Sequence, residues 1–240
     1  MLTEQGATIL YGNQDSWGSI EVNAVVLKEN LDKFIMETNF EKVNIIAHSK
    51  GGIEARYMIS TLGMAGKVAS LTTIATIHNG SKTMDLLCKL PTWLFKIAAK
   101  FVNFFFKILG DSKPDFHTAC TQFTTSHMKS FNDHNPDAPD VYYQSYAAVL
   151  KSPFSDILML LPSSIVWLIE GENDGLVTPS SATWTNFKGI LRGATHRGIS
   201  HADEVDARRM NFTRRTSDNG VSDIRKVYSE IVFGLQQMGL

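Results

Sequence analysis

The sequence predicts an α/β domain with a mostly parallel central sheet and helices on both of its faces. Two observations support this prediction: short apolar runs alternate with segments of helical periodicity, and no repeat or low-complexity linker interrupts them. Such alternation is typical of parallel strands joined by crossover helices. A length of 240 residues suits one domain with a substantial core, so we expect a single domain over residues 1–240.

The first half of the chain contains three predicted strands and two predicted helices. Residues 7–11 and 68–76 have the composition of strands, and 42–48 is expected to be a strand buried on both faces. Residues 18–38 carry apolar side chains at three- and four-residue steps, which indicates a helix with one buried face. Residues 50–63 are the second predicted helix.

The second half contains an insertion, two more predicted strands and a final helix. The segment 82–135 breaks the alternation, and we expect it to be a helical insertion between strands. Residues 141–147 and 164–170 are the two further strands. The last helix has one apolar stripe, made of Ile224, Val227, Tyr228, Ile231, Val232, Leu235 and Met238.

The bulk composition is that of an ordinary globular protein. Apolar residues make up 43% and charged residues 20%, and the formal net charge is −1. This balance gives no sign of a polyanionic partner, so we expect no nucleic-acid binding. Cys88 and Cys120 could pair or stay free, and two cysteines do not indicate a redox compartment. The first residues do not resemble a signal peptide, and the sequence leaves the cellular location open.

Residues 47–51, AHSKG, have the small-x-Ser-x-Gly form of a nucleophile elbow. The turn from strand to helix is so tight that the positions two before and two after the serine, Ala47 and Gly51, are expected to exclude bulk. Ser49 is then held at the end of the sheet, and the N–H of Lys50 points to where an oxyanion would form. The helix N-terminus adds a favourable field for that charge. The alternative is a Ser-x-Gly-Gly turn without chemistry.

A serine nucleophile needs a general base, and the base needs an orienting acid. In enzymes with this elbow the chain order is serine, then Asp or Glu, then histidine. Asp174 follows the predicted strand 164–170, and His201 comes later, so the order is correct. His196 is a competing base and Glu172 an alternative acid, and spacing alone does not separate them.

Four stretches together resemble the bacterial triacylglycerol lipases and esterases of the α/β-hydrolase fold, most closely a branch common in Firmicutes. They are KVNIIAHSKGG (42–52), TTIATIHNGSKTMDLL (72–87), ENDGLV (172–177) and HADEVD (201–206). The resemblance implies that Ser49 is the nucleophile, that Asp174 is the acid, and that His201 rather than His196 is the base.

The chain departs from the family pattern in two places. Ile77 replaces the proline of the family's Pro-His-x-Gly-Ser run. The family's His-Gly motif, whose loop gives the second oxyanion donor, has no counterpart in the first forty residues. The strand that carries it would lie between 7–11 and 42–48, so its loss would leave a gap in the sheet. Either the sequence begins at an internal methionine of a longer gene, or the chain is a remnant that closes the gap in another way.

Residues 91–110 form the most apolar stretch of the chain. Lys96, Lys100, Asn103 and Lys107 fall on one narrow stripe of a helix, and almost all the other residues are large and apolar. The stretch is too short and too charged for a comfortable membrane span, so we expect no transmembrane segment. The resemblance implies a lid that meets a lipid interface. The alternative is a structural helix packed against the sheet.

The resemblance also implies a structural calcium ion that braces the loop of the catalytic histidine. Its ligands would be Asp203, two residues after that histidine, and Asp156, with carbonyls and water completing the shell. Asp203 could instead cap the following helix. His117, Cys120 and His127 have loose spacing for a zinc site, and we interpret them as incidental.

The predicted function is hydrolysis of carboxylic esters, with an ester or lipid as substrate. His201 takes the Ser49 proton, Asp174 fixes the imidazole tautomer, and an acyl-enzyme is the intermediate. No cofactor is required for this chemistry. An acyltransferase or thioesterase on the same triad is an alternative, and so is a non-catalytic lipid-binding remnant.

Overall fold

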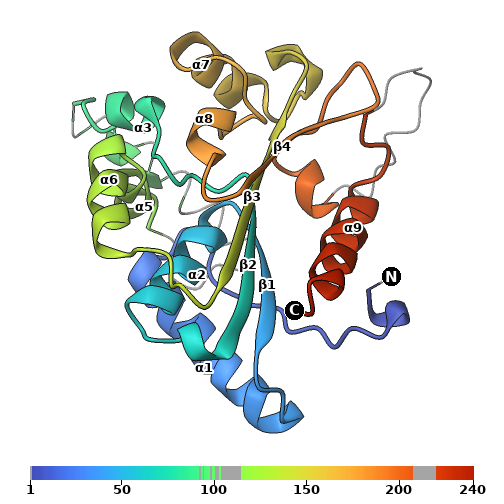
Figure 1. Ribbon diagram of the computed structural model, residues 1–240. Coiled ribbons are helices and arrows are strands. Elements are labelled where there is room, and N and C mark those ends of the chain that lie inside the picture. Colours follow the sequence, from blue (N-terminus) through green and yellow to red (C-terminus); the bar gives the residue numbers. More distant parts are fainter. Residues whose placement is uncertain are drawn as a thin grey trace.

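The computed structural model describes residues 2–91, 93, 95–97, 99–100, 103, 115–207 and 220–240. Within these residues, four strands form one parallel sheet with helices on both faces (Figure 1). The strands are β1 (Val43–His48), β2 (Val68–Ile74), β3 (Tyr142–Val149) and β4 (Phe187–Arg192), and their order in the sheet is β1-β2-β3-β4. The predicted α/β class is therefore confirmed.

Helices and short 3₁₀ turns fill the connections between the strands. The described helices are α1 (Ile20–Thr38), α2 (Lys50–Ser60), α3 (Lys82–Leu87), α5 (Phe116–Gln122), α6 (Thr125–His134), α7 (Leu160–Ile169), α8 (Pro179–Ala182) and α9 (Ile224–Gln237). The 3₁₀ turns are Thr3–Gln5, Ala65–Lys67, Pro153–Ser155 and Asp203–Val205. In the described part of the chain, no helix is both long and apolar enough to cross a membrane.

The two faces of the sheet are covered by different helices. On one face, Leu31 of α1 and Met58 of α2 pack against Leu71 of β2. On the other face, α9 packs against Ile74. Ile74 comes three residues after Leu71 on β2, and residues an odd number apart on a strand point to opposite faces. The buried stripe of α9 is Ile224, Val227, Ile231 and Leu235, as predicted, while Met238 lies beyond the helix and is half exposed. Both predicted helix faces are therefore confirmed.

The prediction of a strand at residues 7–11 is wrong. These residues are irregular, and Tyr11 is 72% exposed. Among the described strands, β1 pairs only with β2, so residues 7–11 do not pair with the other edge of β1. For the same reason β1 is half exposed along most of its length rather than buried on both faces.

The prediction of a strand at residues 164–170 is also wrong, because this run belongs to α7. An apolar run of seven residues fits either a buried strand or a helix, and its neighbours decide between them. Here Leu150, at the end of β3, donates its N–H to the carbonyl of Asn173 at 2.8 Å. The segment 151–172, which includes α7, therefore forms an excursion from the sheet between these two hydrogen-bonded residues. The strand β4 was not predicted.

The predicted insertion contains α3, α5 and α6, and the described residues between 93 and 103 are helical. Phe95 is buried against Cys120 of α5, whereas Trp93 and Ile97 are exposed. Cys120 and Cys88 are both free thiols. Lys107 and most of the predicted aromatic face lie outside the described residues.

Candidate active site

Ser49 lies on the sharp turn between β1 and α2, in a strained backbone conformation. Its φ of 54° and ψ of −132° are values that a residue with a side chain rarely adopts. The Ser49 N–H donates to the carbonyl of Ile74 at 3.0 Å, and the Thr76 hydroxyl donates to the Ser49 carbonyl at 2.8 Å. This geometry presents the serine hydroxyl at the carboxyl end of the sheet.

The steric restriction beside Ser49 falls on Gly52 and not on the predicted Gly51. A Cβ atom at Gly51 would meet nothing within 4 Å outside its own turn of helix, whereas one at Gly52 would lie 2.2 Å from Thr76 Oγ1. The reason is that Gly52 faces Thr73 of β2 and Thr76 just after it, and the missing side chain leaves room for both.

Lys50 is the first residue of α2. Its backbone N–H lies at the helix N-terminus, where the first N–H groups have no acceptor within the helix. Its side chain is buried, and the ammonium group pairs with the Glu54 carboxylate, which also accepts from Asn23. The ammonium group is therefore bound within the helix layer, and the backbone N–H is the group that Lys50 can offer to a substrate.

His201 lies between Ser49 and Asp174 and is hydrogen-bonded to both. Its Nε2 is 2.9 Å from Ser49 Oγ, and its Nδ1 is 2.8 Å from Asp174 Oδ2. The His201 backbone N–H donates to the Asp174 carbonyl at 2.8 Å, so the two loops are also joined through the main chain. The structure thus brings together the three residues that the sequence predicts as nucleophile, base and acid.

The Asp174 carboxylate is fully buried. Besides His201, the backbone N–H groups of Leu176 and Val177 donate to its Oδ1 at 2.9 and 2.8 Å. Burial raises the pKa of Asp174, but the charge of a protonated His201 and these hydrogen bonds lower it more, so its pKa lies below the ordinary carboxyl value. Asp174 is therefore ionised at neutral pH and keeps a proton on His201 Nδ1.

The two competing residues lie at the surface. His196 is exposed on the turn that follows β4, and the structure gives it no hydrogen bond to Ser49. The Glu172 carboxylate pairs with Arg192 at 3.1 Å, and both side chains are about half exposed. Neither residue is positioned as His201 and Asp174 are.

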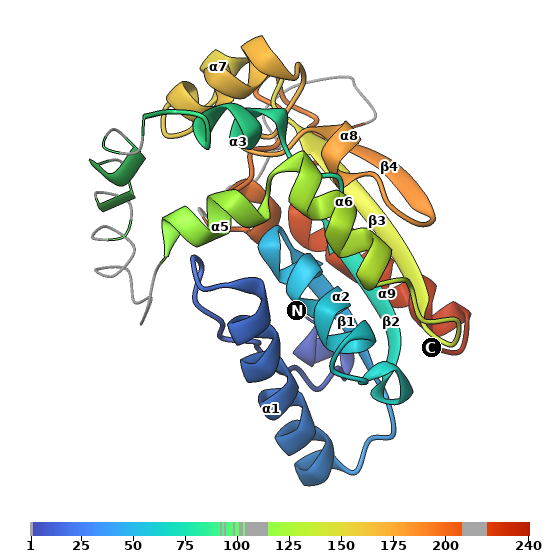
Figure 2. The same ribbon diagram turned by 90° about the vertical axis from the view of Figure 1, so that its left-hand side faces the viewer.

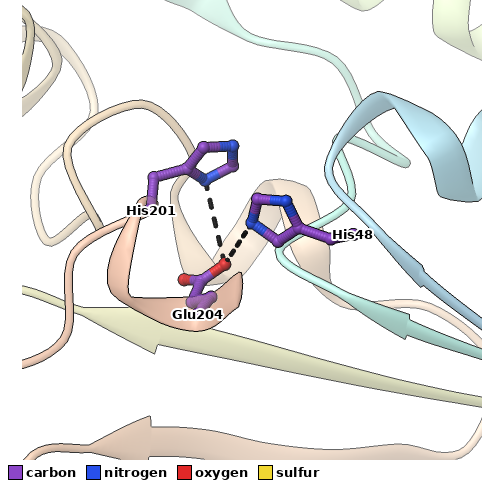
Figure 3. A group of neighbouring side chains, drawn as sticks. All are labelled: His48, His201 and Glu204. Atoms are coloured by element: carbon purple, nitrogen blue, oxygen red, sulfur yellow. Dashed lines mark hydrogen bonds and ion pairs between the residues drawn. The ribbon is translucent and has the colours of Figure 1, made fainter. Parts of the chain in front are cut away.

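A second acid, Glu204, lies beside His201 and was not predicted as part of the site. Its Oε2 is 2.8 Å from His48 Nε2 and 3.8 Å from His201 Nδ1 (Figure 3). Burial, followed by the nearby charge of Asp174, raises the pKa of Glu204 well above its ordinary value. Burial also lowers the pKa of His48 well below its ordinary value, so both shifts disfavour the charged forms of this hydrogen-bonded pair.

The ligand atoms of His48, His201 and Glu204 lie within 4.8 Å of one another, the one such group among the described residues. His201 Nδ1 carries the proton that it donates to Asp174, so it has no lone pair for a metal ion. The loosely spaced zinc-like residues of the sequence, His117, Cys120 and His127, do not belong to this group.

The two predicted calcium ligands, Asp156 and Asp203, both lie near the guanidinium of Arg197. The Arg197 Nη2 is 2.9 Å from Asp156 Oδ2 and 4.0 Å from Asp203 Oδ2. The N-cap of the turn Asp203–Val205 is Ala202, so Asp203 does not cap it. The Asp203 carboxylate instead accepts from the backbone and the hydroxyl of Ser200.

The sequence is similar to triacylglycerol lipases from yeast and bacteria. It is 30% identical over 246 residues to triacylglycerol lipase 2 of Saccharomyces cerevisiae, a match that covers 99% of this chain and 72% of that protein. A triacylglycerol lipase of Pseudarthrobacter phenanthrenivorans is 36% identical over 109 residues, which cover 42% of this chain and 34% of that protein. No protein-family model matches the sequence.

Among solved structures, the Staphylococcus hyicus lipase has a similar fold. The TM-score is 0.67 at 16% identity, and the match covers 99% of this chain and 87% of that chain. At this identity the likeness concerns the fold alone, and it confirms the predicted α/β-hydrolase fold. The narrower assignment to a Firmicutes branch stays a prediction. Because the yeast relative is 30% identical over nearly the whole sequence, this chain belongs to the triacylglycerol lipase family of carboxylic ester hydrolases.

Proposed function

We propose that this chain hydrolyses carboxylic esters of lipids through a covalent acyl-enzyme on Ser49. The observation that supports the proposal most directly is the line of hydrogen bonds from Ser49 Oγ to His201 Nε2 at 2.9 Å and from His201 Nδ1 to Asp174 Oδ2 at 2.8 Å. A serine hydroxyl held in this way has the His201 imidazole as its base, and the Asp174 carboxylate orients that base.

In the first half of the reaction, Ser49 Oγ attacks the ester carbonyl and its proton passes to His201 Nε2. The carbonyl oxygen becomes an oxyanion, which the Lys50 N–H and the N-terminal end of α2 stabilise. The carbon–oxygen bond to the alcohol then breaks, and His201 returns the proton to the leaving alcohol. Ser49 is left as an ester of the fatty acid.

In the second half, a water molecule gives its proton to His201 Nε2 and attacks the acyl-enzyme carbonyl. Collapse of the second oxyanion releases the fatty acid, and His201 returns the proton to Ser49 Oγ. Asp174 stays ionised throughout, which keeps the other imidazole proton on Nδ1 and stabilises the charged ring.

The lipid interface of the proposal rests on an exposed apolar surface that includes α7. The exposed residues of this α7 surface are Phe154, Ile157, Leu158, Leu161, Ile165 and Leu168. Between residues 153 and 169 the one charged side chain is Asp156, and it is buried. Exposed apolar groups gathered in this way are typical of surfaces that meet a partner or a lipid phase.

The insertion extends the α7 surface. The helix α3 lies next to α7 in both views of the molecule, and the two are in contact (Figures 1 and 2). Leu86 of α3, Leu90, Trp93 and Ile97 are exposed as well. We infer that these apolar groups meet the lipid substrate phase, and that the insertion acts as a lid there.

The proposal is tested with a fluorophosphonate probe and p-nitrophenyl esters. We expect the probe to label the wild-type chain, and Ser49→Ala and His201→Ala to lose label and to lose about 10³–10⁶-fold in turnover. His196→Ala is the matched control, and it should keep both the probe labelling and the ester turnover of the wild type.

A folded wild-type chain that takes no label and cleaves no ester would contradict the proposal and favour a non-catalytic remnant. Esterase activity that survives in Ser49→Ala would contradict the assigned nucleophile. Faster turnover with acyl thioesters than with esters would favour a thioesterase on the same residues.

A further inference from the structure

We infer that the Arg197 guanidinium braces the loop of His201 in the place of a calcium ion, so that this chain needs no metal there. The resemblance leads to the expectation of a cation between Asp156 and Asp203. In the structure the Arg197 Nη2 is 2.9 Å from Asp156 Oδ2 and 4.0 Å from Asp203 Oδ2. A positive charge therefore already lies within 4.0 Å of both carboxylates.

Asp156 belongs to the segment that follows β3, and Arg197 holds that segment by more than one contact. The Arg197 Nε donates to the carbonyl of Ser155 at 3.0 Å, beside the ion pair with Asp156. The Arg197 carbonyl accepts from the N–H of Lys151 at 3.2 Å. The turn after β4 is thus tied to the segment after β3 by both the side chain and the main chain of one residue.

Asp203 connects this clamp to the catalytic base. Its Oδ2 accepts from the Ser200 N–H at 3.1 Å and from the Ser200 hydroxyl at 2.8 Å. Ser200 directly precedes His201, so the position of the Asp203 carboxylate fixes the backbone that carries the imidazole. Asp203 is buried and its charge faces Arg197, which makes the guanidinium the cation that holds this loop.

The donor set does not fit a calcium ion while Arg197 is in place. Calcium takes about six to eight oxygen ligands at about 2.3–2.6 Å, and here a guanidinium nitrogen already lies 2.9 Å from one carboxylate and 4.0 Å from the other. Asp203 Oδ1 has no hydrogen-bond partner among the described residues, but it is one oxygen beside an existing cation. A divalent ion there would be repelled by Arg197 and could share the carboxylates only if the arginine moved out.

Arginine is suited to this role by its shape. Its planar group presents several N–H donors in fixed directions and can serve Asp156, Asp203 and the Ser155 carbonyl together. Unlike a bound ion it cannot be removed by a chelator. The clearest consequence of the inference is therefore a loop whose stability does not depend on calcium.

The test is thermal unfolding of the full chain after exhaustive treatment with EGTA and again in millimolar calcium chloride. For the wild type we expect the same melting temperature in both. Arg197→Met removes the charge and keeps much of the volume, and it should lower the melting temperature by about 5–10 °C because two buried carboxylates lose their cation. Calcium should then raise the melting temperature of Arg197→Met.

Arg192→Met is the matched control, because Arg192, the last residue of β4, pairs with Glu172 and both side chains are about half exposed. We expect it to shift the melting temperature by less than about 2 °C and to ignore calcium. The inference is overturned if chelation lowers the wild-type melting temperature, or if Arg197→Met is no less stable than Arg192→Met. An Arg197→Met chain that ignores calcium would overturn the claim that the guanidinium and the ion compete for one place. None of these readouts needs catalysis, so they are independent of the proposed function.

Discussion

Gly51 and Gly52 stand side by side on the first turn of α2, yet only Gly52 is enclosed. We expect Gly52→Ala to lower the free energy of unfolding by about 1–3 kcal/mol, because the new methyl group would overlap Thr76 and Thr73. It should also lower activity, since Thr76 holds the Ser49 carbonyl. Denaturant unfolding and a soluble-ester assay measure the two effects.

Gly51→Ala serves as the control for Gly52→Ala. Its methyl group meets open space, and alanine is a better helix former by up to about 1 kcal/mol, so we expect equal or greater stability. Equal destabilisation by the two variants would show that the close approach of α2 to β2 is not what excludes a side chain.

Glu204 makes stability depend on pH through its raised pKa. Asp174 and Asp203 face it with negative charge, and His48 and His201 are its other titratable neighbours. The folded chain holds the Glu204 proton above the unfolded pKa of about 4.5, so this contribution to stability is complete below that pH and is lost as pH rises through the raised value.

We expect Glu204→Gln, which mimics the protonated acid, to remove the loss of stability that follows the ionisation of Glu204 as pH rises. Urea unfolding between about pH 5 and pH 8 should show a smaller fall in the free energy of unfolding for the variant than for the wild type. The lowered pKa of His48 acts in the opposite direction, and His48 remains in both chains. Parallel curves for the two chains would mean that Glu204 is already ionised in the folded state.

At the scale of elements, α7 exposes an apolar face that a helix surrounded by water would not retain. We expect Leu161→Glu together with Leu168→Glu to lower vesicle binding and hydrolysis of emulsified triacylglycerol by about tenfold or more. Each leucine that enters a lipid phase contributes about 1.5–3 kcal/mol. Turnover of a soluble short-chain ester should stay within about twofold.

Phe233→Glu is the control for the α7 variant. Phe233 is 60% exposed on α9, which lies away from α7 in both views (Figures 1 and 2). This variant should bind vesicles as the wild type does. A similar loss with Phe233→Glu would indicate a general effect of added charge, and an α7 variant that binds vesicles normally would refute the proposed lipid interface.

At the scale of the whole molecule, the strands of the sheet differ in how well they are shielded from solvent. β2 is paired on both sides and buried along most of its length, whereas β1 is paired with β2 alone among the described strands and is half exposed. We expect amide hydrogen exchange of the segment 43–48 to be at least about tenfold faster than that of 68–74. Mass spectrometry of peptides from the two strands measures this, and equal protection would mean that the outer edge of β1 is covered.

The site was predictable where its parts are neighbours in sequence. Ser49 and Lys50 follow from one strand–turn–helix motif, whereas His201 was selected over His196 by the resemblance to the lipases. Arg197 was missed because its partner Asp156 is 41 residues away along the chain. Glu204 was missed for the same reason, since it meets His48 across 156 residues, although it lies only one turn after His201.

By itself, the sequence determined the α/β class, the strands β1, β2 and β3, the buried faces of α1 and α9, and the residues of the nucleophile elbow. These features depend on side-chain periods of 2 and 3.6 and on contacts within a few residues. Only the tertiary structure decided that 7–11 is not a strand, that 164–169 is helical, and that the Arg197 guanidinium lies within 4.0 Å of both Asp156 and Asp203. Each of these depends on which hydrogen-bond and charge partners distant segments bring alongside, and no local pattern contains that information.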